Sequence, residues 1–437
     1  MTNSTGGRRA AWTRALLLGT VLSGAVISAP LNGAKADTQD DINALKAENA
    51  ELREMVKTLS QDVQILKNSV QQTNEAVQAA ATPKAPEKMV QSGRSGVQLT
   101  VSGQANRMAF YADNGDEAQL FNADNDFSST RVNFTGKGKI TDDLTAGATI
   151  EVQIESNSSA DVTIPSERAA ARGTGFNERK LEVFFDSESL GMLSLGQGST
   201  ASDGIAEIDL SGTQVISGSG FDALGASIEY LTSGTNAPSG FAVGDLINNQ
   251  DGLSRDDRMR YDSPSLAGFV ASTSWVDADT WDVALRYAGE FSGWEGQAGI
   301  GYWDASARST GFTGIGGSAA IRAPFGTSLQ GAYTSLDFDS LNRDDTGFWY
   351  VKLGQDFDVI EFGTTGISID YSEAEDESAN GTQASFWSIA LVQAIKKAAT
   401  EIYFNVGQYS GEVPGAGSTT VDLEDITIAG VGARVRF

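Results

Sequence analysis

The chain ends in the stretch that decides its fold, Val431-Gly432-Ala433-Arg434-Val435-Arg436-Phe437. In an extended strand successive side chains point to opposite faces, so the apolar residues lie on one face and both arginines on the other. A dry core on either side of such a strand would leave the arginines buried without water. The pattern is typical of a strand with lipid on one face and water on the other, as in a closed transmembrane β-barrel.

The N-terminus has the three-part pattern of a secretory signal peptide. Arg8, Arg9 and Arg14 precede an apolar run over residues 15–27, and Ala34-Lys35-Ala36 follows as a cleavage site. A membrane anchor is the alternative, but the run is shorter than the roughly 20 residues of a spanning helix. We expect residues 1–36 to be removed and the protein to be exported.

Composition excludes several function classes. The chain contains no Cys and no His, which rules out disulfides, Ser-His-Asp and Cys-His catalysis, and His-ligated zinc. A net charge of −26 argues against nucleic-acid binding. Gly is abundant, with 49 residues, and Pro is scarce, with 8, which suits many strands joined by tight turns. We expect no enzymatic activity, no cofactor and no resident metal.

Residues 37–81 have an apolar period of seven, which predicts a coiled coil. Acidic g positions match basic e positions of the next heptad, which favours a parallel homomeric coil. Asn49, at an a position, is expected to fix the register. The alternative is a single amphipathic helix packed on its own protein. Residues 82–95 contain Pro83 and Pro86 and are expected to form a linker. The a and d positions are Ile42, Leu45, Asn49, Leu52, Val56, Leu59, Val63, Leu66, Val70, Thr73, Val77 and Ala80.

From residue 96 to 437 the apolar period is two. Ile150, Val152 and Ile154 alternate with polar residues, and many later segments alternate in the same way. Charge on the inner face of so many strands suits a water-filled lumen better than the core of a two-sheet sandwich. The predicted fold is therefore an all-β, antiparallel transmembrane barrel preceded by a parallel α-helical coil.

The alternation predicts about sixteen barrel strands, with short and long connections on opposite rims. The strand-like segment 226–230 leaves eighteen strands as the alternative. Long connections are expected at 112–126, 157–176, 200–254, 338–344, 374–383 and 411–422. Acidic clusters at 113–117 and 124–126 could bind calcium, although solvated loop charge is the simpler interpretation.

Three segments carry a resemblance to a known family. Residues 103–107, 127–131 and 259–264 resemble general porins of Gram-negative bacteria, especially alphaproteobacterial ones. A coil ahead of the barrel is similar to sugar and dicarboxylate porins. The resemblance implies an outer-membrane trimer with the coil in the periplasm. The β-branched a residues and Leu d residues of the coil instead favour a dimer. It also implies that the barrel-assembly machinery reads Phe437 as part of its signal.

The resemblance further implies that the loop at about 200–254 folds inward and narrows the lumen. Asp203, Glu207 and Asp209 of this loop would then face a wall of arginines. Strand parity directs four arginines inward, although some could instead pair with Glu151, Glu155 or Glu182. These are Arg131, Arg258, Arg260 and Arg286.

Three functions remain open from the sequence. The first is a passive diffusion channel for small hydrophilic solutes and ions. The second is a substrate-selective sugar or dicarboxylate channel. The third is a structural tether between outer membrane and cell wall.

Overall fold

The computed structural model describes Lys57 and residues 96–166, 176–276, 279–309, 311–338, 343–416 and 419–437. The chain divides into two units, residues 1–88 and 89–437, and the second contains all the described strands. The predicted signal peptide (1–36), coiled coil (37–81, with Asn49) and linker (82–95) lie outside the described residues, except for Lys57. In the described part, no helix has the length and apolar character needed to cross a membrane.

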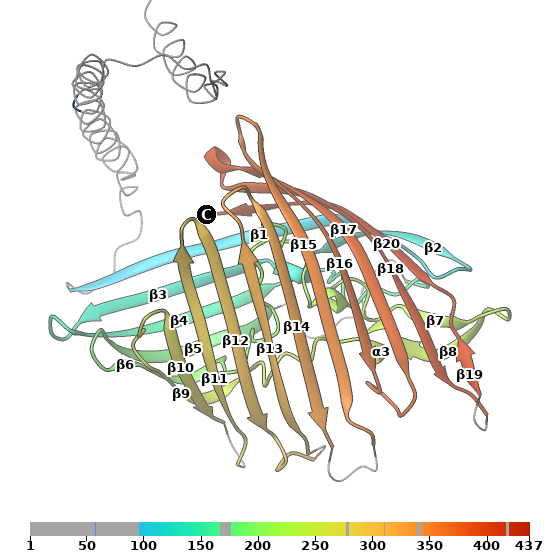
Figure 1. The fold of residues 1–437 in the computed structure, drawn as a ribbon, viewed down its shortest axis with the longest axis horizontal. Helices are drawn as coiled ribbons and strands as arrows, with labels where there is room; N and C mark the ends of the chain where they lie inside the picture. The colour runs from blue at the N-terminus through green and yellow to red at the C-terminus, as the bar shows by residue number, and fades with distance from the viewer. Residues whose placement is uncertain are drawn as a thin grey trace, which may run out of the picture. The chain divides into compact units, whose positions relative to one another are not determined.

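One antiparallel sheet contains most of the described strands, and strands that follow one another in the chain are paired in it (Figure 1). The bounds of its strands are β1 Val97–Asp113, β2 Ala118–Asp124, β3 Arg131–Lys139, β4 Leu144–Ile154, β5 Phe176–Ser187, β6 Gly191–Ser199, β9 Arg255–Asp262, β10 Phe269–Trp275, β11 Trp281–Phe291, β12 Trp294–Asp304, β13 Thr313–Arg322, β14 Thr327–Asp337, β15 Thr346–Ile360, β16 Gly363–Glu375, β17 Gln383–Ile395, β18 Thr400–Pro414, β19 Thr420–Asp422 and β20 Ile426–Arg436.

Two barrel strands are interrupted, so these eighteen segments form sixteen barrel strands within the described residues. β2 and β3 pair with successive parts of β1, on either side of the short helix η1 (Asp126–Ser128). β19 and β20 pair in the same way with β18. The prediction of sixteen strands is therefore confirmed. The expectation of a loop over 112–126 is wrong, because residues 118–124 form β2.

The alternative of eighteen barrel strands is also wrong. The strand-like segment forms β7 (Glu229–Thr232), which pairs with β8 (Ala237–Ala242) in a separate two-stranded sheet. This hairpin lies within the long connection between β6 and β9. β7 of this hairpin forms an isolated antiparallel β-bridge to the barrel, between Thr232 and Leu423.

The C-terminal strand closes the barrel. β20 pairs with β1 from Gln104↔Arg436 to Asp113↔Thr427. Beyond it, the amide of Phe437 donates to the Gly103 carbonyl at 3.0 Å, and the amide of Gly103 donates to the Phe437 carbonyl at 2.9 Å. Val431 and Phe437 are exposed on the outer surface, whereas Arg434 is buried and pairs with Glu401. The two faces of this strand are those that the alternation predicts.

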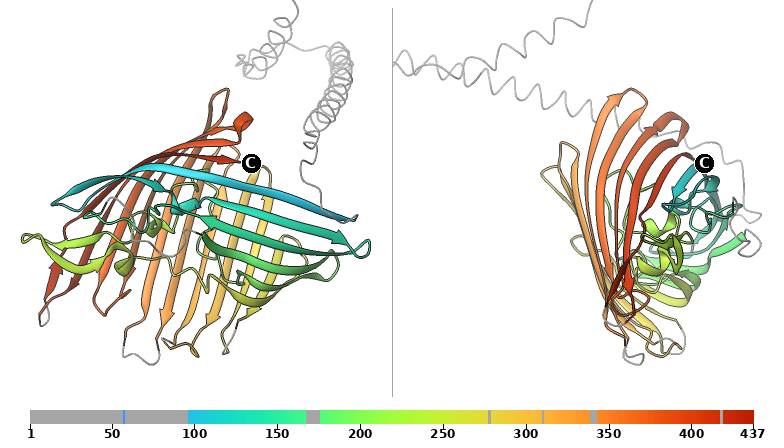
Figure 2. Two further views of the ribbon diagram at one scale, coloured as in Figure 1. Left: turned by 180° about the vertical axis from the view of Figure 1, so that it is seen from behind. Right: turned by 90° about the vertical axis from the view of Figure 1, so that its right-hand side faces the viewer.

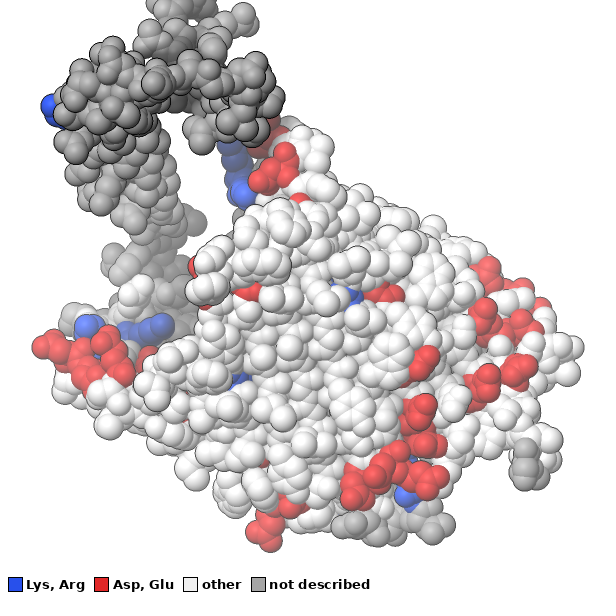
Figure 3. Space-filling view, in the orientation of Figure 1, with Lys and Arg blue, Asp and Glu red and all other residues white. Residues whose placement is uncertain are grey.

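The outer surface is apolar in a band between two rims, one with long connections and the other with tight turns. Exposed side chains such as Leu285, Ile300, Leu353 and Ile389 form a belt across the strands. Figure 3 shows this uncharged belt, with acidic side chains gathered along the edges on both sides of it. The opposite rim, called here the short-turn rim, holds tight connections such as 292–293 and 323–326.

The connection at 200–254 lies inside the barrel (Figure 2). It contains η2 (Phe221–Ala223), β7, β8 and α3 (Val243–Leu246). Its apolar residues pack against inward side chains of β1, β2 and β15 to β20 in one buried cluster, which also contains Val162 and Ile164. One side of the interior is thus a dry core rather than a water-filled lumen. Phe110 of β1 and Trp303 of β12 are also fully buried inside the barrel.

Candidate functional site

A buried carboxylate fixes the beginning of the inward loop. Asp282 of β11 is inaccessible to solvent and accepts hydrogen bonds from the amides of Ala201, at 3.2 Å, and Ser202, at 2.8 Å. The Ser202 hydroxyl donates to the same carboxylate at 2.6 Å. A carboxylate can accept several hydrogen bonds at once. Asp282 therefore accepts hydrogen bonds from two backbone amides that would otherwise be unpaired inside the barrel.

Three of the predicted arginines hold neighbouring groups in place. Arg286 donates to the carbonyls of Ala201, at 2.7 Å, and Asp203, at 2.8 Å. Arg260 donates to the Thr200 carbonyl at 2.6 Å and pairs with Asp262, and Arg258 pairs with Glu182 at 2.5 Å. All three face the interior, yet none belongs to the lining of the main polar cavity described below.

A buried ion pair fixes the middle of the loop to the opposite wall. The ammonium of Lys352, on β15, lies 2.7 Å from the Asp209 carboxylate and donates to the Ser217 carbonyl at 2.9 Å. The Ser217 hydroxyl in turn donates to Asp370 at 2.5 Å. These contacts cross the boundary between loop and wall, so the loop is held by polar contacts as well as by its apolar core.

The loop leaves a polar cavity of about 880 Å³ between itself and the β3–β5 side of the barrel. The cavity is the candidate constriction of the lumen. Its charged lining residues are Asp126, Arg131, Arg179, Asp203, Glu207, Asp209, Asp222, Asp251 and Arg255. Of the seven predicted eyelet residues, the structure brings four together here: Arg131, Asp203, Glu207 and Asp209.

The basic side of the cavity includes two arginines that sequence parity missed. Arg179 shares the outward parity of Leu181, but a bulge in β5 opposite Glu151 and Val152 leaves it unpaired in the ladder. Its guanidinium instead reaches Glu151 at 2.9 Å and Gln153 at 2.8 Å, inside the barrel. Arg255, the first residue of β9, lies 3.9 Å from Asp203. Only the bulge and the adjoining loop direct these two side chains inward.

The acidic side comes from both limbs of the loop. Asp251, on the returning limb, accepts hydrogen bonds from the amides of Gly204, at 2.5 Å, and Ala206, at 2.7 Å. Glu207, on the first limb, accepts one from Asn249 at 3.1 Å. Asp222 and Asp251 were not predicted, because only the fold brings the returning limb beside the first one.

Enclosure in the barrel changes the ionisation of these acids. Desolvation, together with neighbouring acids, raises the pKa of Asp251 to about 8 and that of Asp222 to about 7. Desolvation also raises the pKa of Glu207, although its side chain still contacts the water of the cavity. Since each group gains negative charge above its pKa, the cavity becomes more negative as the pH rises from 6 to 9.

The described residues contain no group of three or more His, Cys, Asp or Glu side chains arranged to hold a metal ion. The acidic and basic side chains of the cavity face one another across it. Opposed arginines and carboxylates in such a passage exert a field on any ion or dipole that enters it.

Comparisons with known proteins agree with this architecture. A family model described as Gram-negative porin matches residues 76–413. No curated protein matches the chain. Among solved structures, the chain is similar to an anion-selective porin from Comamonas acidovorans, with 15% identity over 78% of this chain and 100% of that one and a TM-score of 0.52. It is also similar to the trimer form of OmpT from Vibrio cholerae, with 14% identity, 78% and 100% coverage and a TM-score of 0.52.

OprB of Pseudomonas putida gives a similar result, with 10% identity over 78% of this chain and 94% of that one and a TM-score of 0.50. At such low identities these structures show the shared fold alone. The family model covers well over half of the chain. The chain therefore belongs to the Gram-negative porin family: it is an outer-membrane β-barrel that forms a diffusion channel, and it is not an enzyme.

Proposed function

We propose that the cavity beside the inward loop is the constriction of a general diffusion channel for small hydrophilic solutes and ions. The observation that carries this proposal is the meeting of Arg131, Arg179 and Arg255 with acids from both limbs of the loop in one polar cavity. Arg179 is already paired with Glu151. Asp209 is likewise paired with Lys352. The other lining acids outnumber Arg131 and Arg255, so the constriction is expected to prefer cations more strongly as the pH rises through the raised pKa values of Asp222 and Asp251.

Charge substitutions in the cavity test this proposal. Replacing Arg131 and Arg255 with Ser is expected to increase cation preference, because the variant removes two positive charges from the lining of the cavity. Replacing Asp203 with Asn and Glu207 with Gln is expected to shift preference toward anions. The measurement is the reversal potential of each folded variant in a planar bilayer under a salt gradient.

Arg308 provides a matched control, because it pairs with Asp256 at 2.6 Å and does not line the cavity. Arg308→Ser is expected to leave the reversal potential nearly unchanged. Equal reversal potentials for the wild type and both sets of cavity variants would refute the constriction.

A substrate-selective channel is the second candidate function. The dry core on the β15–β20 side supports it, because the loop leaves only part of the lumen to solutes. Saturable block of the ion current by one sugar or dicarboxylate, in a panel of solutes of similar size, would favour this function over general diffusion.

The protein is further proposed to be a homotrimer with its coil, residues 37–81, in the periplasm. The heptad pattern and the similarity to a porin of trimeric form support this assembly. Because the chain has no Cys, Leu52→Cys introduces a unique thiol at a d position. Oxidation is expected to link copies through this residue if the coil is parallel, whereas Lys57→Cys, outside the a/d seam, is the control. Failure of Leu52→Cys to crosslink would contradict the parallel coil.

The closing contact of the barrel supports a role for Phe437 in assembly. Its backbone pairs with Gly103, and its ring lies on the outer surface. We propose that this residue both completes the seam and presents an aromatic end to the barrel-assembly machinery.

A further inference from the structure

The short helix η1, which interrupts the second barrel strand, borders the polar cavity. Asp126, Phe127 and Ser129 line the cavity, as does Arg131 at the beginning of β3. The position of this turn therefore affects both the width and the charge of the passage. The turn lies between the β1–β2 ladder and the β1–β3 ladder and belongs to neither, so its carbonyls need other donors.

Two side chains of β1 supply these donors. The amide of Gln104 donates to the carbonyls of Ser128, at 3.0 Å, and Ser129, at 2.9 Å. The amide of Asn106 donates to the same Ser128 carbonyl at 2.9 Å. Both side chains are buried. Because a buried carbonyl without a donor is costly, these two amides hold the turn against β1.

The last two barrel strands contribute two further side chains. Arg434 of β20 donates to the Ser128 hydroxyl at 2.6 Å, and Glu401 of β18 balances its charge at 2.6 Å. The Tyr403 hydroxyl of β18 donates to Asn106 Oδ1 at 2.6 Å. Arg434 and Tyr403 are both buried. The turn is thus held from the first barrel strand and from the strands that close the barrel.

Gly432 makes the contact of Tyr403 possible. It is in register with Tyr403 in the β18–β20 ladder, and a Cβ at position 432 would overlap the Tyr403 hydroxyl. Because glycine has no side chain, the hydroxyl can pass over β20 and reach Asn106 on the next strand. This inward residue of the C-terminal stretch therefore has a packing role.

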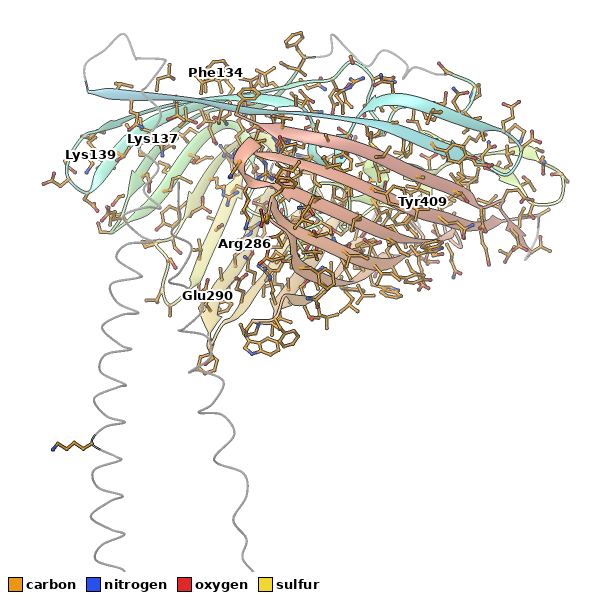
Figure 4. All side chains as sticks on the ribbon, turned by 90° about the horizontal axis from the view of Figure 1, so that it is seen from above. Phe134, Lys137, Lys139, Arg286, Glu290 and Tyr409 are labelled. Carbon is orange, nitrogen blue, oxygen red and sulfur yellow. The ribbon has the colours of Figure 1, made fainter. Side chains whose placement is uncertain are left out.

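β18 also holds the inward loop. Tyr409, labelled in Figure 4, shares the inward face of β18 with Tyr403. Its hydroxyl donates to the carbonyls of Phe221, at 2.8 Å, and Leu224, at 2.9 Å, at the two ends of η2. η1 and η2 are neighbours, and both contribute to the lining of the cavity. Two tyrosines of one strand thus hold the two short helices beside the passage.

We propose that Gln104, Asn106, Tyr403 and Arg434, called here the seam latch, are positioning residues of the constriction. None of the four lines the cavity. They join η1 to the strands that meet where the barrel closes, so the ion selectivity of the passage depends on contacts at this seam. Since Arg434 reaches η1 from β20, the constriction takes its final form only when β20 has paired with β1. The proposal rests on the constriction proposed above.

The neutral substitution Gln104→Met tests the latch, because it removes the donor and keeps the length of the side chain. A turn without this donor opens locally more often, so the variance of the open-channel current in a planar bilayer is expected to rise at least about twofold. Gln330→Met is the matched control. Gln330 is buried on the inner face of β14, and its amide has no hydrogen-bond partner among the described residues. Equal current variance in the wild type and both folded variants would overturn the latch.

The reversal potential under a salt gradient measures the effect on selectivity. It is recorded at pH 9, because the cavity becomes more negative up to that pH. Asp126→Asn is expected to shift it toward anion preference. In the Gln104→Met background this shift is expected to fall to about half or less, because Asp126 no longer keeps its place in the cavity. In the Gln330→Met background it should be unchanged. Equal shifts in all three backgrounds would overturn the positioning role.

Arg434→Gln tests the contribution of the closing strand, and Arg436→Gln is its control. Arg436 carries the same charge and pairs with the same Glu401, at 3.3 Å, whereas Arg434 also contacts Ser128. The current variance should rise in Arg434→Gln alone. Ser128→Ala removes only the shared hydroxyl and should also raise the variance, even if Arg434→Gln does not fold. Variance in Ser128→Ala equal to that in Arg436→Gln would overturn the role of β20.

Failure of the latch and failure of the constriction give different results. If the constriction is wrong, Asp126→Asn and the variants at Arg131, Arg255, Asp203 and Glu207 all leave the reversal potential unchanged. If the constriction is right and the latch is wrong, Asp126→Asn shifts the reversal potential equally in every background.

Discussion

Phe221→Ala is expected to destabilise the inward loop by about 3–5 kcal/mol, the usual cost of removing a fully packed Phe side chain. Phe221 is buried at 1% exposure in the middle of the dry core. Its ring centroid lies 4.9 Å from that of Phe386 and 5.9 Å from that of Phe348. A third aromatic residue of the wall, Tyr409, lies beside the same ring. Among the described loop residues, Phe221 is the one whose ring contacts three aromatic rings of the wall.

Loosening this contact has a functional consequence. A loop that leaves the wall exposes part of the lumen now filled by the core, so single-channel conductance and current noise are expected to rise. The measurements are conductance in planar bilayers and the free energy of unfolding in detergent. Phe362→Ala is the control, because that ring is exposed at a turn. An unchanged conductance together with unchanged stability would show that the loop does not depend on this core.

Lys352→Met is expected to cost about 3–5 kcal/mol of unfolding free energy, because it leaves the Asp209 carboxylate buried without its cation. Lys352 is 1% exposed, and Asp209 is 9% exposed. The double variant Lys352→Met with Asp209→Leu replaces both partners with apolar residues, so no unpaired carboxylate is left buried. The double variant is therefore expected to be more stable than the single one.

A double-mutant cycle on the unfolding free energy in detergent checks this expectation. The coupling between the two positions should be strongly favourable in the wild type. If the single variant is as stable as the double variant, the ion pair does not hold the loop. Arg322→Met, at a partly exposed ion pair elsewhere in the lumen, is the control and should cost far less.

Most barrel strands were predictable because alternation is a local property of the chain. Segments such as 144–154 and 191–199 have one apolar and one polar or small face, and both form barrel strands. β2 was missed because its residues, among them Gln119 and Asn122, lie between acidic clusters that resemble a loop. It is a strand because β1 offers it a partner, and that partner is a non-local feature.

The candidate site was only partly predictable for similar reasons. Arg131 followed from strand parity, but Arg179 is directed inward by a bulge that no local pattern indicates. The dry core was not predicted, because an inward Phe110 or Trp303 has the same sequence context as an aromatic residue at the membrane interface. Which side such a ring faces depends on the loop that packs against it, far away in the chain.

The one-sided core also has a mechanical consequence. A hollow tube yields to lateral pressure by becoming oval, whereas packed protein interiors are hardly compressible. Here the loop braces the wall formed by β15 to β20, β1 and β2, and its residues Ala201, Ile205 and Leu253 also pack against β11 and β12. The β3–β5 wall borders the polar cavity instead. Pressure from the surrounding bilayer is therefore borne unequally around the circumference. Any bending falls on the β3–β5 side, so a stiffer or thicker membrane would alter the width of the passage more than the shape of the rest of the barrel.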